Sequence, residues 1–180
     1  MTTAAILKAA QFAAERHKNQ RRKDMHASPY INHPLALASV LAVEGGVNDP
    51  DVICAALLHD TLEDTETTAA ELALHFGDEV TGIVLEVTDD KSKDKADRKE
   101  LQVQHAPHIS TRAKLVKLAD KICNLRDILA SPPADWPVER KREYFDWAFR
   151  VVAGMRGVHP DLEAVFDDLF SRGLEELGKK

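Results

Sequence analysis

The sequence predicts an all-α protein, and three observations support this. Apolar residues recur at helical spacing along the whole chain, whereas no stretch alternates apolar and polar residues as a half-buried strand would. Prolines, glycines and capping residues divide the chain into segments of medium length. The connections between these segments are short. Together these features predict a compact, irregular multi-helix bundle in a single domain spanning residues 1–180.

Start and stop signals define the individual segments. Asp49 is placed to cap a helix whose first turn holds Pro50, and Thr68 with Glu71 three residues later forms a capping box. The densely charged stretch Asp89–Lys99 has no such signal, so we expect a mobile loop there. The expected helices are, in chain order, Ala4–His17, Pro34–Glu44, Pro50 to the cluster His59–Asp64, Thr68–Gly77, Glu79–Val87, Lys99–His105, Ser110–Leu129, Val138–Met155 and Asp161–Leu174.

Composition excludes several classes of function. No apolar run approaches the roughly 18 residues that a membrane helix needs, and Met1–Ala14 lacks the basic start and apolar stretch of a signal peptide. A net charge of −6 argues against a protein that binds nucleic acid, although an anionic small molecule fits if positive charge is concentrated locally. Cys54 and Cys123 lie in apolar helical surroundings, as reduced thiols do, so we expect a soluble cytoplasmic protein. The sequence does not indicate an oligomeric state.

One predicted helix ends in a cluster of potential metal ligands. The apolar run Val52–Leu58 must be buried on nearly all sides, so His59 and Asp60, which follow it, are held at the edge of the core. Glu63 and Asp64 come three and four residues after Asp60, and they return to the same side if the helical turn continues. These residues therefore predict a concentrated negative site.

Two further candidates lie elsewhere in the sequence. Asp120 falls in an apolar sector of its helix, where an unpaired carboxylate is costly, so an arginine, a lysine or a metal ion should face it. The ordinary alternative is a surface salt bridge with Lys117 or Lys121. His33 stands at the entrance of a helix, and the following Pro34 disfavours helical backbone at the preceding residue. We therefore expect an extended backbone at His33, with its imidazole pointing away from the helix.

These side chains form a mixed set of nitrogen and oxygen ligands. Imidazoles from His33 and His59 with carboxylates from Asp60 and Asp120 contain no thiolate, which suits Mn²⁺, Fe²⁺ or Zn²⁺ more than a closed structural zinc site. A metal-activated water is a nucleophile at neutral pH, and Glu63–Asp64 would manage protons around it. A His-Asp pair at a helix end also arises by chance, so the residues alone leave a purely structural interpretation open.

Several short motifs together resemble a known family. In order they are Gln20-Arg21-Arg22-Lys23-Asp24, Pro29-Tyr30-Ile31-Asn32-His33-Pro34, His59-Asp60-Thr61-Leu62-Glu63-Asp64, Val87-Thr88-Asp89-Asp90 and Lys117-Leu118-Ala119-Asp120-Lys121 with Asn124. This pattern resembles the hydrolase domain of RelA/SpoT proteins, and among these the stand-alone small alarmone hydrolases of the metazoan SpoT type. The resemblance extends from about Ala9 to Phe170. The long RelA/SpoT proteins also carry a synthetase domain, and this sequence ends before one could begin, so we expect it to hydrolyse the alarmone and not to make it.

The resemblance implies the HD-domain fold and a Mn²⁺-dependent hydrolysis of ppGpp or pppGpp to GDP or GTP and pyrophosphate, with one ion in the active site. It also implies roles for individual residues. The matched metal ligands are His33, His59, Asp60 and Asp120, the pair that activates water and handles the proton is Glu63 and Asp64, and the substrate contacts are Arg22, Lys23, Lys95, Asn124, Arg140 and Tyr144.

Two rival functions stay open at this point. The same site could act on another phosphate substrate, such as the 2′-phosphate of NADPH. The domain could also be a non-catalytic HD-like signalling module, for which we would expect ligands or the carboxylate pair to be lost, and here all are present. Outside the family pattern, Arg21–Lys23 would be interpreted as a solvated basic loop and Tyr144 as a core aromatic. Helical spacing nevertheless places Tyr144 and Arg140 on one face, where they could flank a base or phosphate.

Overall fold

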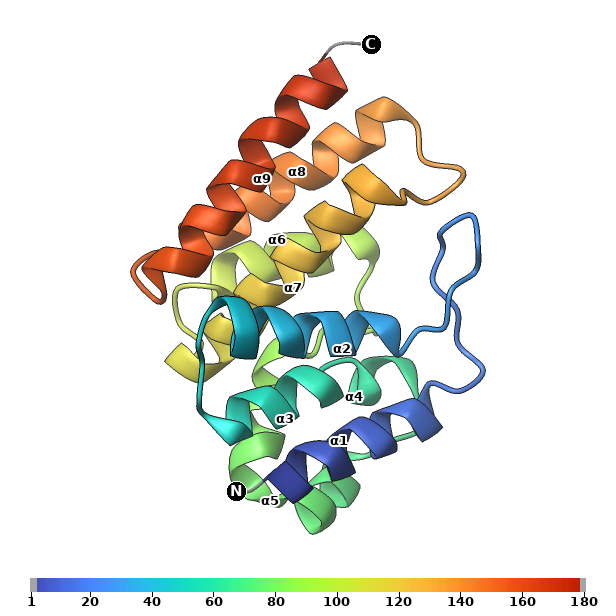
Figure 1. The fold of residues 1–180 in the computed structure, drawn as a ribbon, viewed down its shortest axis with the longest axis vertical. Coiled ribbons are helices and arrows are strands. Elements are labelled where there is room, and N and C mark those ends of the chain that lie inside the picture. Colours follow the sequence, from blue (N-terminus) through green and yellow to red (C-terminus); the bar gives the residue numbers. More distant parts are fainter. Residues whose placement is uncertain (1–2, 179–180) are drawn as a thin grey trace.

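The computed structural model describes residues 3–178, and within them the chain forms helices and no strand (Figure 1). The all-α prediction is confirmed. In chain order the elements are α1 (Thr3–Arg16), α2 (Asn32–Ser39), the π-helical turn η1 (Val40–Glu44), α3 (Pro50–Leu58), α4 (Thr61–Asp64), α5 (Ala69–Val87), α6 (Lys95–His105), α7 (Thr111–Ala130), α8 (Val138–Ala153) and α9 (Pro160–Gly178).

The helix α3 is the centre of the first half of the fold. It packs against α1, α2 and α5, which surround it in the lower part of Figure 1. Every residue of the run Val52–Leu58 is at most 5% exposed, as its continuous apolar character predicts. Its C-terminal end is consequently fixed in the core, and the residues that follow it start from rigid backbone.

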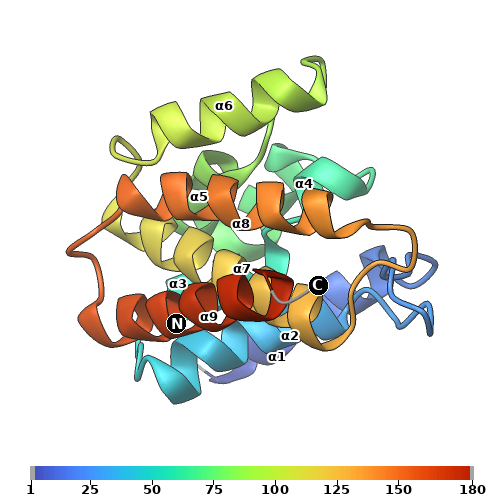
Figure 2. The same cartoon turned by 90° about the horizontal axis from the view of Figure 1, so that it is seen from above.

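The helix α7 joins the two halves of the molecule. It packs against α2, α3 and α5 on one side and against α8 and α9 on the other. Figure 2 shows α6 at the outer edge of this arrangement, and no residue of α6 is buried. Within the part of the chain that the structure describes, no helix is both long and apolar enough to cross a membrane.

The capping residues predicted from the sequence form the expected hydrogen bonds at the starts of their helices. The Asp49 side chain accepts a hydrogen bond from the backbone N–H of Asp51 (3.0 Å), and Thr68 accepts one from the backbone N–H of Glu71 (3.2 Å). Gly77 adopts a φ of 83°, which an L side chain rarely tolerates. The chain therefore kinks inside α5 at the glycine where the sequence predicts that one helix closes.

The predicted loop at Asp89–Lys99 is wrong in its second half. The helix α6 begins at Lys95, because Asp94 is a working N-cap whose carboxylate accepts a hydrogen bond from the backbone N–H of Asp97 (2.9 Å). An acidic residue in the first turn adds a favourable interaction with the helix dipole. Within the stretch 89–99, only residues 89–94 lie outside a helix. The dense charge of this stretch concealed an ordinary start signal.

Candidate active site and metal centre

A cavity of about 630 Å³ lies between α4, α6, α7 and α8, and an adjoining cavity of about 620 Å³ shares part of its wall. Lys23 lines only the second cavity, whereas the residues that line both are Arg22, His33, Asp64, Asn124 and Tyr144. The remaining predicted residues, which line the first cavity, are His59, Asp60, Glu63, Lys95, Asp120 and Arg140. The fold thus brings every predicted site residue to one pair of adjoining cavities.

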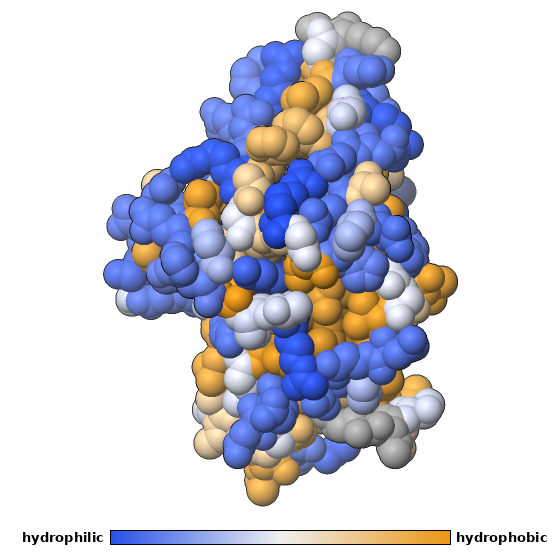
Figure 3. Space-filling view, turned by 90° about the vertical axis from the view of Figure 1, so that its left-hand side faces the viewer, coloured by the Kyte–Doolittle hydropathy of each residue, from blue (hydrophilic) through white to orange (hydrophobic). Residues whose placement is uncertain are grey.

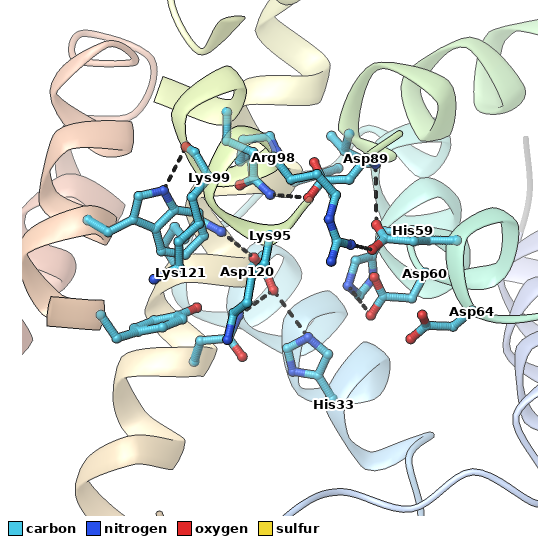
Figure 4. Close-up of a pocket in the computed structure, with 18 of the residues that line it drawn as sticks. His33, His59, Asp60, Asp64, Asp89, Lys95, Arg98, Lys99, Asp120 and Lys121 are labelled. Atoms are coloured by element: carbon cyan, nitrogen blue, oxygen red, sulfur yellow. Dashed lines mark hydrogen bonds and ion pairs between the residues drawn. The ribbon is translucent and has the colours of Figure 1, made fainter. Parts of the chain in front are cut away.

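The predicted metal ligands converge on the same space. The side chains of His33, His59 and Asp60 each offer one ligand atom, and these atoms lie within 4.8 Å of one another. Asp120 approaches from α7, with its Oδ1 3.2 Å from Nε2 of His33 (Figure 4). One ion near these three side chains would have donors from α2 and from the end of α3, and Asp120 of α7 lies beside His33.

The orientation of His59 suits a metal ligand. Its Nδ1 lies 2.8 Å from the carbonyl oxygen of Ala56, so Nδ1 donates and Nε2 is left to face the cavity. Nε2 is 2.9 Å from Oδ2 of Asp60 but does not have hydrogen-bond geometry, and it is buried without another partner among the described residues. A buried nitrogen lone pair beside a carboxylate is the donor set that a divalent cation requires. The residues therefore fit such an ion.

The backbone at His33 differs from the prediction. His33 lies within α2, which begins at Asn32, and its N–H donates to the carbonyl oxygen of Tyr30 (3.0 Å). Pro34 is tolerated because it stands in the first turn, where its missing N–H would have no helical partner in any case. His33 itself is 4% exposed. Its imidazole is thus positioned by buried helix and not by an extended segment.

Charge interactions hold the two predicted ligand carboxylates, Asp60 and Asp120, ionised. Burial alone would raise the pKa of Asp60, but the neighbouring His59 outweighs burial and lowers it overall. The pKa of Asp120 is also held well below its usual value against burial, chiefly by Lys121, whose Nζ lies 3.0 Å from Oδ2 of Asp120. In the metal-free site the charge of Asp60 outweighs the opposite effect of burial and raises the pKa of His59 to about 9, so a cation that binds at Nε2 takes the place of a proton there. The site is therefore anionic in the carboxylates and ready for a cation.

Tyr30 supports one of these ligands directly. Its hydroxyl donates a hydrogen bond to Oδ2 of Asp60, and its ring packs between the rings of His17 and His33 at 4.8 and 6.1 Å. Burial, with the nearby charge of Asp60, raises the pKa of Tyr30, so its hydroxyl keeps its proton. Tyr30 was part of a sequence motif, but the sequence alone assigned it no role.

Replacing Tyr30 by Phe is expected to weaken metal binding by roughly tenfold, because a lost partner of a ligating carboxylate typically costs that much affinity. The ring packing is kept, so the melting temperature of the metal-free protein should change little. Calorimetric titration of the chelated protein with Mn²⁺ measures the effect. An unchanged affinity would show that Asp60 needs no support from Tyr30.

Glu63 occupies the inner side of the cavity, with its side chain 19% exposed. Its Oε2 accepts a hydrogen bond from the backbone N–H of Asp89 (3.2 Å), and its Oε1 is 3.5 Å from the Arg98 guanidinium. Burial, followed by the negative charge of Asp89, raises the pKa of Glu63. A carboxyl group whose pKa is raised toward neutrality can exchange a proton during a reaction.

Asp64 occupies the outer side of the same opening. Its Oδ1 is 2.7 Å from Nζ of Lys91, and its Oδ2 accepts a hydrogen bond from Nε2 of Gln20 (3.0 Å). Figure 4 shows Asp64 on the far side of Asp60 from Asp120. The two carboxylates of the predicted pair therefore have different surroundings, one largely buried and one held by polar side chains.

A wall of cationic side chains faces these carboxylates. Lys95, Arg98 and Lys99 project from α6, and Lys117 and Lys121 from α7. Burial lowers the pKa of Lys95, as do the nearby charges of Arg140 and Lys23, and burial with the charge of Lys121 lowers that of Lys117 to about 8. Cations that repel one another inside a cavity are stabilised by a polyanion.

Sequence reasoning identified Lys95 but missed the rest of this wall. The signal was present, because Arg98 and Lys99 follow Lys95 by three and four residues and so share its face of a helix. That spacing indicates a shared face only if the segment is helical, and the sequence predicted a loop there. Lys117 and Lys121 were considered only as possible partners of Asp120, and Lys121 is indeed its partner.

Aromatic side chains close the opposite end of the cavity. The Arg140 guanidinium lies 4.3 Å from the centre of the Trp136 ring, and the Trp136 and Tyr144 rings are 5.9 Å apart. Asn124 donates to Oδ1 of Asp120 (2.7 Å) and therefore also supports a predicted metal ligand. Arg22 forms an ion pair with Asp127 at the junction of the two cavities. A flat ring with a cation beside it can accommodate a nucleobase or a phosphate.

Comparison with known proteins agrees with this geometry. The family model of the HD domain matches residues 9–155. A guanosine-3′,5′-bis(diphosphate) 3′-pyrophosphohydrolase MESH1 from Xenopus tropicalis is 58% identical over 167 residues, covering 93% of each chain. The protein of the same name from Homo sapiens is 54% identical over 172 residues, covering 95% of this chain and 96% of the relative.

Solved structures give the same result. The structure described as a metazoan ortholog of SpoT that hydrolyzes ppGpp superposes with a TM-score of 0.92 at 44% identity and covers 96% of this chain and 97% of that one. A second match, lmo0812 from Listeria monocytogenes, has a TM-score of 0.67 at 28% identity and covers 83% of this chain. This chain therefore belongs to the HD-domain family and, within it, to the stand-alone proteins related to the metazoan SpoT ortholog, as its sequence motifs predict.

Proposed function

We propose that this enzyme is a Mn²⁺-dependent guanosine-3′,5′-bis(diphosphate) 3′-pyrophosphohydrolase, which converts ppGpp or pppGpp to GDP or GTP and pyrophosphate. The observation that carries the proposal is the combination in one cavity of the ligand set His33, His59 and Asp60, the carboxylate pair Glu63–Asp64 and a wall of cations. Relatives more than half identical over nearly their whole length are named for this activity. We also propose that residues 1–180 act as one hydrolase domain.

The proposed reaction needs charge neutralisation and proton transfer at one phosphorus atom. Hydrolysis forms a bond from a water oxygen to the phosphorus attached to O3′ and breaks the bond from that phosphorus to O3′. Pyrophosphate leaves, and O3′ gains a proton. When bound, a divalent cation supplies Lewis-acid chemistry to the phosphoryl group and lowers the pKa of a nearby water. Glu63 and Asp64 are placed to take the proton of the water and to deliver one to O3′.

The cationic and aromatic side chains position the substrate. Phosphoryl transfer depends chiefly on placement and on charge stabilisation, so side chains that fix four or five phosphate groups are central to it. Lys95 and Arg140 lie at the first cavity, and Arg22 and Lys23 bring positive charge to the second. We propose that the two phosphate arms of the nucleotide extend over this wall, with Tyr144 beside the nucleoside.

The ligand set suits Mn²⁺, Fe²⁺ or Zn²⁺, and the resemblance to the RelA/SpoT hydrolases favours Mn²⁺ among these. Imidazole and carboxylate side chains without a thiolate would hold such an ion. We propose one ion per active site, held by His33, His59, Asp60 and Asp120. We further propose a cytoplasmic location, because Cys54 and Cys123 are buried free thiols whose pKa values burial raises to about 11 and about 12.

Product analysis tests the proposed function. Purified protein with Mn²⁺ is expected to release pyrophosphate and GDP from ppGpp, and a chelator should abolish this turnover until Mn²⁺ is restored. NADPH and deoxynucleoside triphosphates serve as competing substrates under the same conditions. A negligible kcat/KM for ppGpp beside fast release of phosphate from NADPH would replace the proposed substrate. Absence of turnover with every compound would favour a non-catalytic module.

A further inference from the structure

Asp64 needs external support if it is to act at a defined position. It is the last residue of α4, which has four residues, and Thr65 after it is extended. The Asp64 side chain is 27% exposed. A carboxylate at the end of one helical turn, partly in solvent, has several rotamers available. A proton-transfer group loses much of its effect when it is displaced by about 1 Å.

Gln20 supplies a fixed partner for this carboxylate. Its side-chain Nε2 donates to Oδ2 of Asp64 at 3.0 Å. The backbone of Gln20 is held on both sides, because its N–H donates to the carbonyl oxygen of His17 (2.9 Å) and its own carbonyl accepts from the N–H of Tyr30 (3.1 Å). The Gln20 side chain therefore reaches Asp64 from a turn whose backbone is held by its own hydrogen bonds. The side-chain amide takes no part in these bonds.

His17 determines which way the Gln20 amide points. An ionised carboxylate only accepts hydrogen bonds, so Gln20 must present its NH₂ to Asp64 and its Oε1 to the other side. There Oε1 lies 2.6 Å from Nδ1 of His17, and an amide oxygen also only accepts. Nδ1 of His17 therefore carries the proton. His17 is 2% exposed, and its Nε2 is buried without a partner among the described residues.

The other oxygen of Asp64 has a different kind of partner. Lys91, 2.7 Å from Oδ1, has a side chain that is 51% exposed and belongs to the irregular segment before α6. An exposed lysine beside a phosphate-binding cavity can exchange its carboxylate partner for a phosphate group of a substrate. Gln20 is neutral, buried on its His17 side and unable to pair with phosphate in the same way. It is the partner that stays when the substrate arrives.

We propose that Gln20, oriented by the Nδ1–H of His17, is a positioning residue that fixes the carboxylate of Asp64 for its part in proton transfer. The inference rests on the proposed function, in which Asp64 belongs to the reacting pair. Neither Gln20 nor His17 touches the ligand set, so their contribution is expected in kcat and not in metal content or KM.

Replacing Gln20 by Leu is expected to lower kcat for ppGpp by roughly tenfold at unchanged KM, Mn²⁺ content and melting temperature. Gln104→Leu is the matched control, because Gln104 is exposed and its side chain donates a hydrogen bond to Glu100 in its own helix, away from the predicted site residues. Its kcat should equal that of the wild type. A Gln20→Leu enzyme with wild-type kcat overturns the inference, and so does a change confined to the melting temperature.

Two variants at His17 separate orientation from packing. His17→Asn keeps a donor near the place of Nδ1–H and is expected to retain kcat within about twofold, whereas His17→Leu should resemble Gln20→Leu. Equal kcat values for the two variants contradict the inference. Nitrogen-15 NMR of histidine-labelled protein should find His17 protonated at Nδ1, and protonation at Nε2 contradicts it independently of activity. A wild-type enzyme without ppGpp turnover refutes the proposed function itself, whereas an active wild type with the outcomes above refutes only the role of Gln20.

Discussion

Replacement of Glu63 by Gln is expected to lower kcat by at least about 100-fold, the range typical for loss of a general acid or base. Gln keeps the shape of the side chain and an oxygen that accepts from the backbone N–H of Asp89. It cannot exchange a proton. Burial and the charge of Asp89 hold the pKa of Glu63 above its ordinary value, which is the state that a proton-transferring carboxyl group requires.

Three measurements make this prediction specific to the chemical step. Steady-state kinetics with ppGpp gives kcat and KM, elemental analysis gives bound Mn²⁺, and thermal unfolding gives the melting temperature. The last two should match the wild type, because Glu63 is not placed among the ligands. Glu66→Gln is the control, since it makes the same change at an exposed glutamate three residues away. If kcat for Glu63→Gln equals that of the wild type, Glu63 has no part in the mechanism.

The part of the site that could be predicted from sequence is the part that local pattern fixes. The apolar run Val52–Leu58 had to be buried, and this placed His59 and Asp60 at the edge of the core. Asp120 had to have a partner because it lies in an apolar sector, and Lys121 is that partner. In each case the residues that decide the prediction lie close together in the sequence.

The remaining features depend on contacts between distant segments. Nothing in the sequence joins His33 to Asp120, 87 positions apart, or Gln20 to Asp64, 44 positions apart, apart from the resemblance to a family. The backbone of His33 was wrongly predicted because a local preference against helix before proline gave way to packing in the first turn of α2. The cations of α6 were missed because a charged stretch was interpreted as a loop.

Replacement of Asp120 by Asn is expected to weaken Mn²⁺ binding by at least about 100-fold and to abolish turnover, because it removes a proposed charged ligand without changing the size of the side chain. It should also destabilise the metal-free protein. Lys121 has a side chain that is 3% exposed, and Asp120 is the carboxylate beside it. Removing one partner of a buried ion pair leaves an uncompensated charge and costs about 3 kcal/mol. The Trp147 ring, 4.2 Å from the Lys121 ammonium, offsets only part of this cost.

The pH dependence of this loss identifies its origin. The pKa of Asp120 is depressed in the folded state, so its contribution to stability is complete above its unfolded pKa of about 3.9. That contribution is lost as the pH falls from there toward the folded value. Urea unfolding of the metal-free proteins should therefore show the full difference in the free energy of unfolding between wild type and Asp120→Asn at pH 7. The difference should be smaller at pH 3. Asp168→Asn, which removes an exposed partner of Arg172, should change stability little at either pH. Equal stability of the wild type and Asp120→Asn at pH 7 would mean that Lys121 does not depend on Asp120, and the carboxylate would then be retained for the metal alone.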